Sequence, residues 1–318
     1  MNIDIILDKV EKFFKYELYF YIKRVNKKYY IIRRPALGAG FFSNYFWVLG
    51  HIEFAKKIGY IPVVDMENYP VLYSEDEAVN GTKNAWNYYF ENVDNVDLQT
   101  AYGSGRYVLC KETAMAKYAY KYCQNRIWFF PTEKTISYYA PVIQNNMKIK
   151  ADIRKHLEEE WNKMTTGRGK ILGVHVRGTD MKNNLGHPMP ANVEVYLQKM
   201  NDMLKKDSNI TDIYLATDEI NVLECFEKEY QSKEVVLHYQ DAFRVRDNGE
   251  VKKTGVHETK VEFARKFHKY KMGLEVLQDA YLLSKCNYFL CGYSNVSNAV
   301  ILWNNHEFEQ VELCSSYE

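Results

Sequence analysis

The 318-residue sequence has little proline, no long apolar run and no excess of charge of either sign. No stretch approaches the roughly 18 apolar residues that a membrane-spanning helix needs. With 42 basic and 41 acidic residues the net charge is +1, which argues against a dedicated nucleic-acid-binding protein, because such proteins are usually strongly basic. The first residues lack the basic segment and small-residue cleavage site of a secretory signal, so we expect a cytoplasmic protein.

Several chemistry-bearing motifs are also absent. The six cysteines form no CxxC pair and no zinc-like Cys/His spacing, so we expect no metal site and buried, reduced thiols. There is no GxxxxGK[ST] loop, no complete GxGxxG and no GxSxG turn. These absences argue against P-loop kinases, nicotinamide-dependent enzymes and serine hydrolases of the α/β type.

Alternating strand and helix patterns predict an α/β protein. The first half contains a βαβ unit, which favours a parallel sheet. It consists of a β-rich run at residues 29–34, a Gly-containing loop, a helix that stops at Gly59 and a strand at 61–65. After a helical region at about 133–164, strands and helices alternate again in the second half. Further strands are expected at 170–177, 212–217, 234–237 and 287–290.

The length allows about two domains. Thr165 to Gly169 is a short polar segment with two glycines, and it is the best candidate linker. We therefore predict an amino-terminal α/β domain over residues 1–165 and a ligand-binding domain over residues 166–318.

The first 34 residues are rich in Phe and Tyr and become basic toward their end. No acidic residue occurs between Ile22 and Arg34. One interpretation is that residues 14–34 rest on an anionic membrane surface. The alternative is an amphipathic helix packed on its domain, with a solvated basic face.

Two polar clusters follow predicted strands, where ligands of open parallel sheets bind. His175 and Arg177 lie on the same side of one strand, and an arginine there can hold a phosphate. The alternatives are a core histidine and a surface ion pair. Asp218 and Glu219 follow the next strand and can accept hydrogen bonds from a base or ribose, or this segment simply caps the helix that follows.

A third cluster combines Asp279 with the turn that carries Ser294, Asn295 and Ser297. A strand, a small-residue turn and a helix start offer backbone N–H groups to an anion, although either serine could serve only as a helix cap. A fourth candidate is the amino-terminal glycine-rich loop with Gly40, which is weak as a GxG alone.

In their order along the chain, these motifs resemble those of the GT-B fucosyltransferases that use GDP-fucose, in particular the core α-1,6-fucosyltransferases and the nodulation-type bacterial enzymes. The matching pieces are His-x-Arg at 175–177, Ala-Thr-Asp-acid at 216–219, and Asp279 with four residues before Ser284, then a strand and a Ser-containing turn. The resemblance covers residues 171–303. The amino half matches loosely, through the Gly-rich turn with Asn44.

The resemblance implies two Rossmann-like domains facing a cleft, and an inverting transfer of L-fucose from GDP-β-L-fucose to a hydroxyl of a glycan, on a surface polysaccharide or a lipid-linked saccharide. It implies no metal and no cofactor beyond the donor. Arg177 would hold the β-phosphate, and Asp218 and Glu219 would face guanine or ribose. The implied donor site also takes in His175, Asp279, Ser294, Asn295, Ser297, Gly40 and Asn44.

The sequence departs from the family pattern at two positions. Gly178 stands where the core enzymes have a second arginine, and Leu185 stands where they have a glutamate suggested as the base. Asp180 and His187 are then the candidates for deprotonating the acceptor hydroxyl. Alternative functions are transfer from another nucleotide sugar, or binding of a sugar nucleotide or glycan without catalysis.

One aromatic cluster has two interpretations. It could stack on the faces of acceptor sugars or pack in the core. Its members are Trp86, Tyr88, Tyr89 and Phe90.

Overall fold

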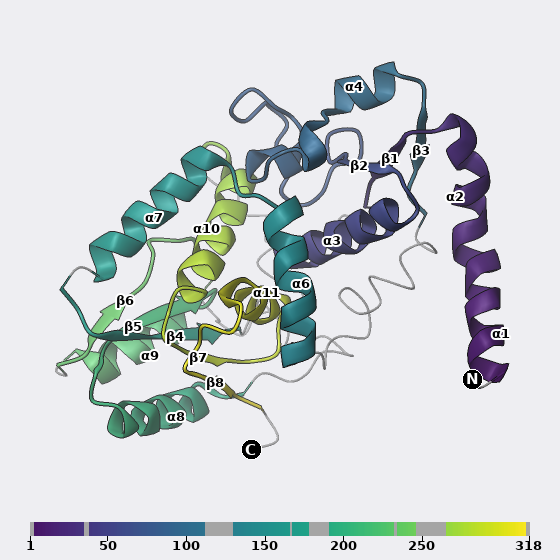
Figure 1. Ribbon diagram of the computed structural model, residues 1–318. Helices are drawn as coiled ribbons and strands as arrows, with labels where there is room; N and C mark the ends of the chain where they lie inside the picture. The colour runs from purple at the N-terminus through teal and green to yellow at the C-terminus, as the bar shows by residue number, and fades with distance from the viewer. Residues whose placement is uncertain are drawn as a thin grey trace. The chain divides into compact units, whose positions relative to one another are not determined.

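The chain forms two compact units, each with its own parallel sheet (Figure 1). The computed structural model describes residues 3–34, 38–111, 130–165, 167–177, 191–231, 234–245 and 265–315. The first unit comprises Met1–Arg126 and Pro141–Lys150, and the second Ile127–Ala140 and Ala151–Glu318. The prediction of an α/β protein with two Rossmann-like parts, as in the GT-B class, is confirmed. Within the described ranges, no helix is long and apolar enough to cross a bilayer.

The first unit is built on a three-stranded sheet in the order β2-β1-β3. Its strands are β1 (Tyr29–Ile32), β2 (Ile61–Val64) and β3 (Tyr107–Leu109), all parallel. Helix α3 (Phe41–Lys57) links β1 to β2, as the βαβ pattern predicts, and it is buried on most sides. Gly59, with a φ of 77°, ends the helix region in a conformation that favours glycine.

The connection from β2 to β3 packs aromatic side chains into the first unit. It contains two 3-10 turns, Ala85–Tyr88 and Val93–Asn95, and the short helix α4 (Leu98–Gly103). The aromatic cluster at residues 86–90 is buried, and the rings of Trp86 and Phe90 stack with centroids 4.4 Å apart. The core interpretation of this cluster is therefore correct. Helix α4 and strand β3 were not predicted.

The amino-terminal segment is helical. Helix α1 (Ile3–Lys12) continues through a π-helical turn (Phe13–Glu17) into α2 (Leu18–Lys23) and a 3-10 turn (Arg24–Asn26). Phe20 on α2 is buried, and its ring contacts those of Tyr30 and Phe54. The packed amphipathic helix is thus confirmed for α2.

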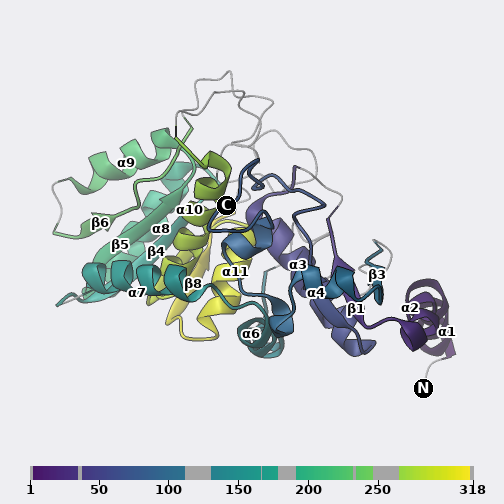
Figure 2. The same ribbon diagram turned by 90° about the horizontal axis from the view of Figure 1, so that it is seen from above.

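The second unit is built on a five-stranded parallel sheet in the order β6-β5-β4-β7-β8. Helices α8 and α9 cover one face, and α7, α10 and α11 cover the other (Figures 1 and 2). Its strands are β4 (Lys170–Val176), β5 (Ile210–Thr217), β6 (Val236–His238), β7 (Tyr288–Cys291) and β8 (Gln310–Leu313). Its helices are α7 (Ala151–Thr165), α8 (Val193–Lys206), α9 (Ile220–Tyr230), α10 (His268–Leu283) and α11 (Asn295–Asn304). Strand β8 was not predicted.

The helical region expected at about 133–164 is divided into two helices. Helix α6 (Glu133–Asn146) runs from the second unit into the first, and Ile149 then forms a bridge with Phe90 before α7 begins. Helix α7 packs on α10, so it belongs with the second sheet. The polar segment predicted as a linker, which begins at Thr165, leads from α7 into β4 within the second unit.

Candidate functional site

The strand order of the second sheet changes direction next to β4. From β4 the chain moves outward to β5 and β6, and then returns through α10 to β7, on the other side of β4. In such sheets ligands bind beyond the carboxyl ends of the strands at this switch point. His175 and Arg177 close β4 here, and the turn at 292–294 closes β7. The structure thus brings together residues that are more than 110 positions apart.

A buried hydrogen-bond network joins the ends of β4 and β7. The Ser297 hydroxyl donates to the carbonyl of Gly292 at 2.7 Å, and its oxygen lies 3.0 Å from Nδ1 of His175. Because this hydroxyl uses its own proton on Gly292, Nδ1 of His175 is assigned as the donor and Nε2 as the acceptor. This arrangement suits a neutral imidazole.

Burial is the main cause that lowers the pKa of His175 to about 4, and the positive charge of Arg177 adds to it. Asp218 acts in the opposite direction. The ring is therefore neutral at pH 7 and serves to position the turn after β7. The core alternative therefore holds for this histidine, and its contact with a donor remains a prediction.

The turn after β7 is a helix cap. The Ser294 oxygen accepts from the backbone N–H of Ser297 at 2.9 Å, which makes Ser294 the N-cap of α11. Gly292 is required in this turn, because a Cβ there would lie 2.6 Å from the Tyr196 hydroxyl. The capping alternative is thus correct for Ser294, and Ser297 is buried in the same network. Together they hold the α11 N-terminus, beginning at Asn295, at the end of β7, where a helix dipole favours an anion.

The second cluster brings a cation and an anion together. Nη1 of Arg177, after β4, lies 3.1 Å from Oδ2 of Asp218, after the neighbouring strand β5. Both side chains are about four-fifths buried, with exposed fractions of 23% and 17%. The ion-pair alternative is therefore realised, but in a partly buried position at the carboxyl ends of the strands. It fixes the direction of a guanidinium that carries five N–H donors.

Glu219 lies deeper than Asp218. It is buried at the N-cap position of α9, and its backbone N–H donates to Oγ1 of Thr217 at 3.2 Å. Val245 braces this segment, since its N–H donates to the Asp218 carbonyl and its own carbonyl accepts from Ile220. The segment thus works both as a helix start and as the support of Asp218.

Asp279 is held on the face of the sheet rather than at its edge. On α10 it accepts a hydrogen bond from the Tyr214 hydroxyl at 2.8 Å. Tyr214 lies three residues before the end of β5, or about 10 Å back along the strand. Burial raises the pKa of Asp279 to about 7, although Tyr214 and Arg244 oppose the shift. Asp279 therefore lies back along β5 from the strand ends that carry Arg177 and Asp218.

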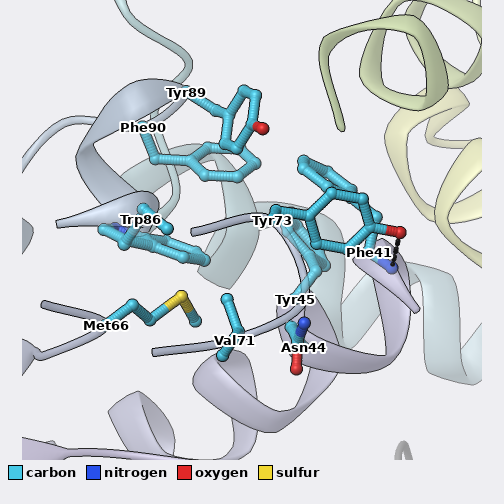
Figure 3. A pocket seen from close by; sticks show the side chains of 10 residues that line it. Phe41, Asn44, Tyr45, Met66, Val71, Tyr73, Trp86, Tyr89 and Phe90 are labelled. Carbon is cyan, nitrogen blue, oxygen red and sulfur yellow. Dashed lines mark hydrogen bonds between the residues drawn. The ribbon is translucent and has the colours of Figure 1, made fainter. Parts of the chain in front are cut away.

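The remaining predicted donor residues lie in the first unit. Gly40 is the N-cap residue of α3, and Nδ2 of Asn44 donates to the Ala39 carbonyl at 3.1 Å. Asn44 also lines a small aromatic pocket (Figure 3). Among the described residues its Oδ1 has no hydrogen-bond partner although the side chain is buried. The rest of the lining consists of Phe41, Tyr45, Met66, Val71, Tyr73, Ala85, Trp86, Tyr89 and Phe90.

Two features of these units were missed by the sequence interpretation. Nη2 of Arg34 donates to the Ser43 hydroxyl at 3.0 Å and so ties β1 to the first turn of α3. In the second unit, a polar pocket lies between α7, α10 and the β5–β6 edge. His238 lies in its wall, and Nε2 of this histidine is 2.6 Å from Oδ1 of buried Asp212. Its lining comes from four separate segments, so no local pattern in the sequence marks it.

Two predicted catalytic residues, Asp180 and His187, lie outside the described residues, as do Gly178 and Leu185. In the described part of the chain, no three His, Cys, Asp or Glu side chains group in a way that could hold a metal ion.

The lowered pKa of His175 gives a testable pH dependence. The folded protein binds fewer protons than the unfolded chain between pH 6.5 and about 4, so the free energy of unfolding falls as pH drops through this window. We expect a loss of up to about 1.4 kcal/mol per pH unit. In urea unfolding series, His175→Gln should flatten this slope.

The matched control for this prediction is His306→Gln, which changes an exposed histidine of the same unit. His268, whose pKa is also lowered to about 4, is present in all three proteins, so the difference between them isolates His175. Equal slopes for the native chain and His175→Gln would contradict the assignment of a buried neutral imidazole.

Comparisons with known proteins identify the family and the fold of the chain. The family model of alpha-(1,6)-fucosyltransferase N- and catalytic domains matches residues 123–300. The solved structure of NodZ alpha-1,6-fucosyltransferase soaked with GDP-fucose is similar with a TM-score of 0.50 and 16% identity, over 87% of this chain and 92% of that chain. This similarity shows the shared fold.

Two further solved structures are similar at lower scores. NodZ from Bradyrhizobium gives a TM-score of 0.47 and 14% identity, over 86% of this chain and 92% of that one. POFUT1 in complex with GDP gives a TM-score of 0.49 and 10% identity, over 91% of this chain and 98% of that one. No curated protein sequence matches the chain. Since the family model spans more than half of its 318 residues, the chain belongs to the alpha-(1,6)-fucosyltransferase family.

Proposed function

We propose that this enzyme transfers L-fucose from GDP-β-L-fucose to a hydroxyl of a glycan, with inversion at the anomeric carbon. The observation that carries the proposal is the Arg177–Asp218 pair at the switch point of the second sheet, in a member of a fucosyltransferase family. The related NodZ structure soaked with GDP-fucose supports this donor. The acceptor we propose is a surface polysaccharide or a lipid-linked saccharide, and the location is cytoplasmic, in keeping with the buried free thiols of Cys110, Cys286, Cys291 and Cys314.

Charge development in the reaction explains why these groups are needed. When the bond between the sugar and GDP breaks, negative charge grows on the β-phosphate. Arg177 supplies a fixed positive charge, and the α11 N-terminus supplies N–H groups and the positive end of the helix dipole. Asp218 keeps the guanidinium oriented before the donor arrives, so little reorganisation is needed during the reaction.

The other predicted contacts remain part of this proposal. Asp218 and Glu219 would face the nucleoside. Asp279, which accepts the hydrogen bond from Tyr214, would lie near the sugar nucleotide. The remaining contacts would come from His175, from the turn with Ser294, Asn295 and Ser297, and from Gly40 and Asn44.

Replacing Arg177 by alanine tests the donor site. We expect Arg177→Ala to lower fucose transfer and donor hydrolysis by at least about 10²-fold, because a fixed charge on the leaving group is lost. Arg177→Lys should recover only part of the rate, since an ammonium lacks the planar fork. Transfer is measured with labelled GDP-fucose, and binding with calorimetry against GDP and UDP.

The control variant is Arg154→Ala, which removes an exposed arginine paired with Glu158 on α7 of the same unit. It should keep native turnover and native GDP affinity. Near-native turnover in Arg177→Ala would refute the site assignment, and tight UDP binding in place of GDP would favour another nucleotide sugar. GDP binding without any turnover would favour the non-catalytic alternative, which the leucine at position 185 motivates.

We propose that no metal ion takes part, because Arg177 and the start of α11 offer positive potential where the diphosphate charge develops. The transfer rate should then be the same, within a factor of about two, with excess EDTA and with added Mg²⁺ or Mn²⁺. Loss of activity in EDTA that returns with one added cation would overturn this proposal.

Asp180 is the base we favour, with His187 as the alternative. A general base contributes about 10² to 10⁴-fold to such a transfer. Asp180→Asn should therefore lower kcat by that range and remove the acidic limb from the pH profile of kcat/KM. The same experiment on His187→Gln should leave that limb in place. An unchanged rate in Asp180→Asn, with a loss in His187→Gln, would reassign the base to His187.

A further inference from the structure

The α1–α2 helix has two different faces. One face is bound to the first unit: Phe20 packs among Tyr30, Phe54 and Tyr60, and Oε1 of buried Glu17 accepts from Lys57 at 3.2 Å. These contacts fix how the helix is turned about its axis. They also determine which side chains are left on its outer face.

The helix also carries a set of exposed apolar side chains. Leu7, Phe14, Ile22 and Val25 are exposed by 60%, 62%, 64% and 82% of their surface. Val10 belongs to the same set. From Leu7 to Phe14 these residues recur at spacings of three and four, so they share one side of the helix. Exposed apolar side chains concentrated on one element usually mark an interaction surface.

The same end of the first unit is strongly basic. Two lysines are exposed there: Lys23 is the last residue of α2, and Lys28 directly precedes β1. Two exposed basic residues of a distant segment lie nearby. The backbone N–H of Lys28 donates to the carbonyl of Arg106 at 2.7 Å, which places the backbone of Arg106 beside Lys28, and Nζ of Lys111 lies 3.4 Å from the centroid of the Tyr19 ring on α2. No acidic residue occurs in the chain between Ile22 and Arg34.

We propose that the α1–α2 helix lies in the surface of an anionic lipid bilayer and attaches the enzyme to it. Leu7, Val10, Phe14, Ile22 and Val25 enter the boundary between headgroups and acyl chains, while Lys23, Lys28, Arg106 and Lys111 contact the lipid phosphates. An apolar stripe with an aromatic residue, bordered by cations, is the pattern of helices that lie flat in the interface.

Charge complementarity is the reason for choosing a lipid surface over a second copy of the chain. Three residues of the basic patch lie outside the helix, namely Lys28, Arg106 and Lys111, so the patch is broader than a helix–helix contact needs. An anionic bilayer satisfies the patch and the apolar stripe together. The benefit of attachment rests on the proposed function, because a lipid-linked acceptor would lie at such a surface.

Vesicle sedimentation tests the attachment without donor or acceptor. The intact chain should sediment with vesicles that contain about one third phosphatidylglycerol, and much less with pure phosphatidylcholine vesicles. Phe14→Gln/Ile22→Gln should weaken binding at least about tenfold. The control Tyr138→Gln changes an aromatic residue of α6 that is exposed by 54%, and it should bind like the native chain.

The charge contribution has its own matched pair. Lys23→Gln/Lys28→Gln should weaken binding by about fivefold for each lysine and reduce its dependence on salt. The control Lys155→Gln/Lys205→Gln removes two exposed lysines of the second unit. It should change neither the strength of vesicle binding nor its dependence on salt. Thermal unfolding of each variant separates lost attachment from lost folding.

Three results would overturn the proposal. The first is equal sedimentation with anionic and neutral vesicles, and the second is no sedimentation with either. The third is a chain that binds no vesicles but forms a concentration-dependent dimer, which Phe14→Gln/Ile22→Gln converts to a monomer. That result would assign the apolar stripe to contact with a second copy of the chain. Fucose transfer to a water-soluble acceptor, measured without vesicles, should stay native in Phe14→Gln/Ile22→Gln. Loss of that activity in the intact chain would refute the proposed function and leave the attachment result standing.

Discussion

The candidate site depends on the parallel pairing of β4 with both of its neighbours. Because β5 and β7 run in the same direction as β4, the carboxyl ends of all three strands reach one edge of the sheet. That single constraint places Arg177 beside Asp218 and brings His175 to the turn before α11. A one-residue change in register at β4 would turn these side chains to the opposite face.

The site combines one oriented cation with one neutral, buried histidine. Burial and the charge of Arg177 both lower the pKa of His175, so the positive charge stays on the arginine alone. The neutral ring then holds the turn that carries the α11 N-terminus. The ion pair with Asp218 fixes Arg177, and the capping network fixes the start of α11. These are the two groups that would meet the diphosphate.

The amino-terminal helix confirms one of the two interpretations of this segment, and attachment to a lipid surface is our proposal. Packing through Phe20 confirms an amphipathic helix bound to its unit. The same packing leaves Phe14, Ile22 and Val25 exposed beside a basic patch. Anchoring the helix on one side is what makes its other side available to a lipid surface.

Local patterns in the sequence determined the α/β class, most strands and helices of the second unit, and the motifs at 175–177 and 216–219, because strand ends and helix starts depend on nearby residues. Strand β3, strand β8 and the division between α6 and α7 depend on pairing with distant segments, such as the Ile149–Phe90 bridge. Only the tertiary structure decided that Arg177 pairs with Asp218, that Asp279 is held by Tyr214 on the face of the sheet, and that residues 86–90 pack inside. Burial and long-range hydrogen bonds create these relations, and a single sequence does not record them.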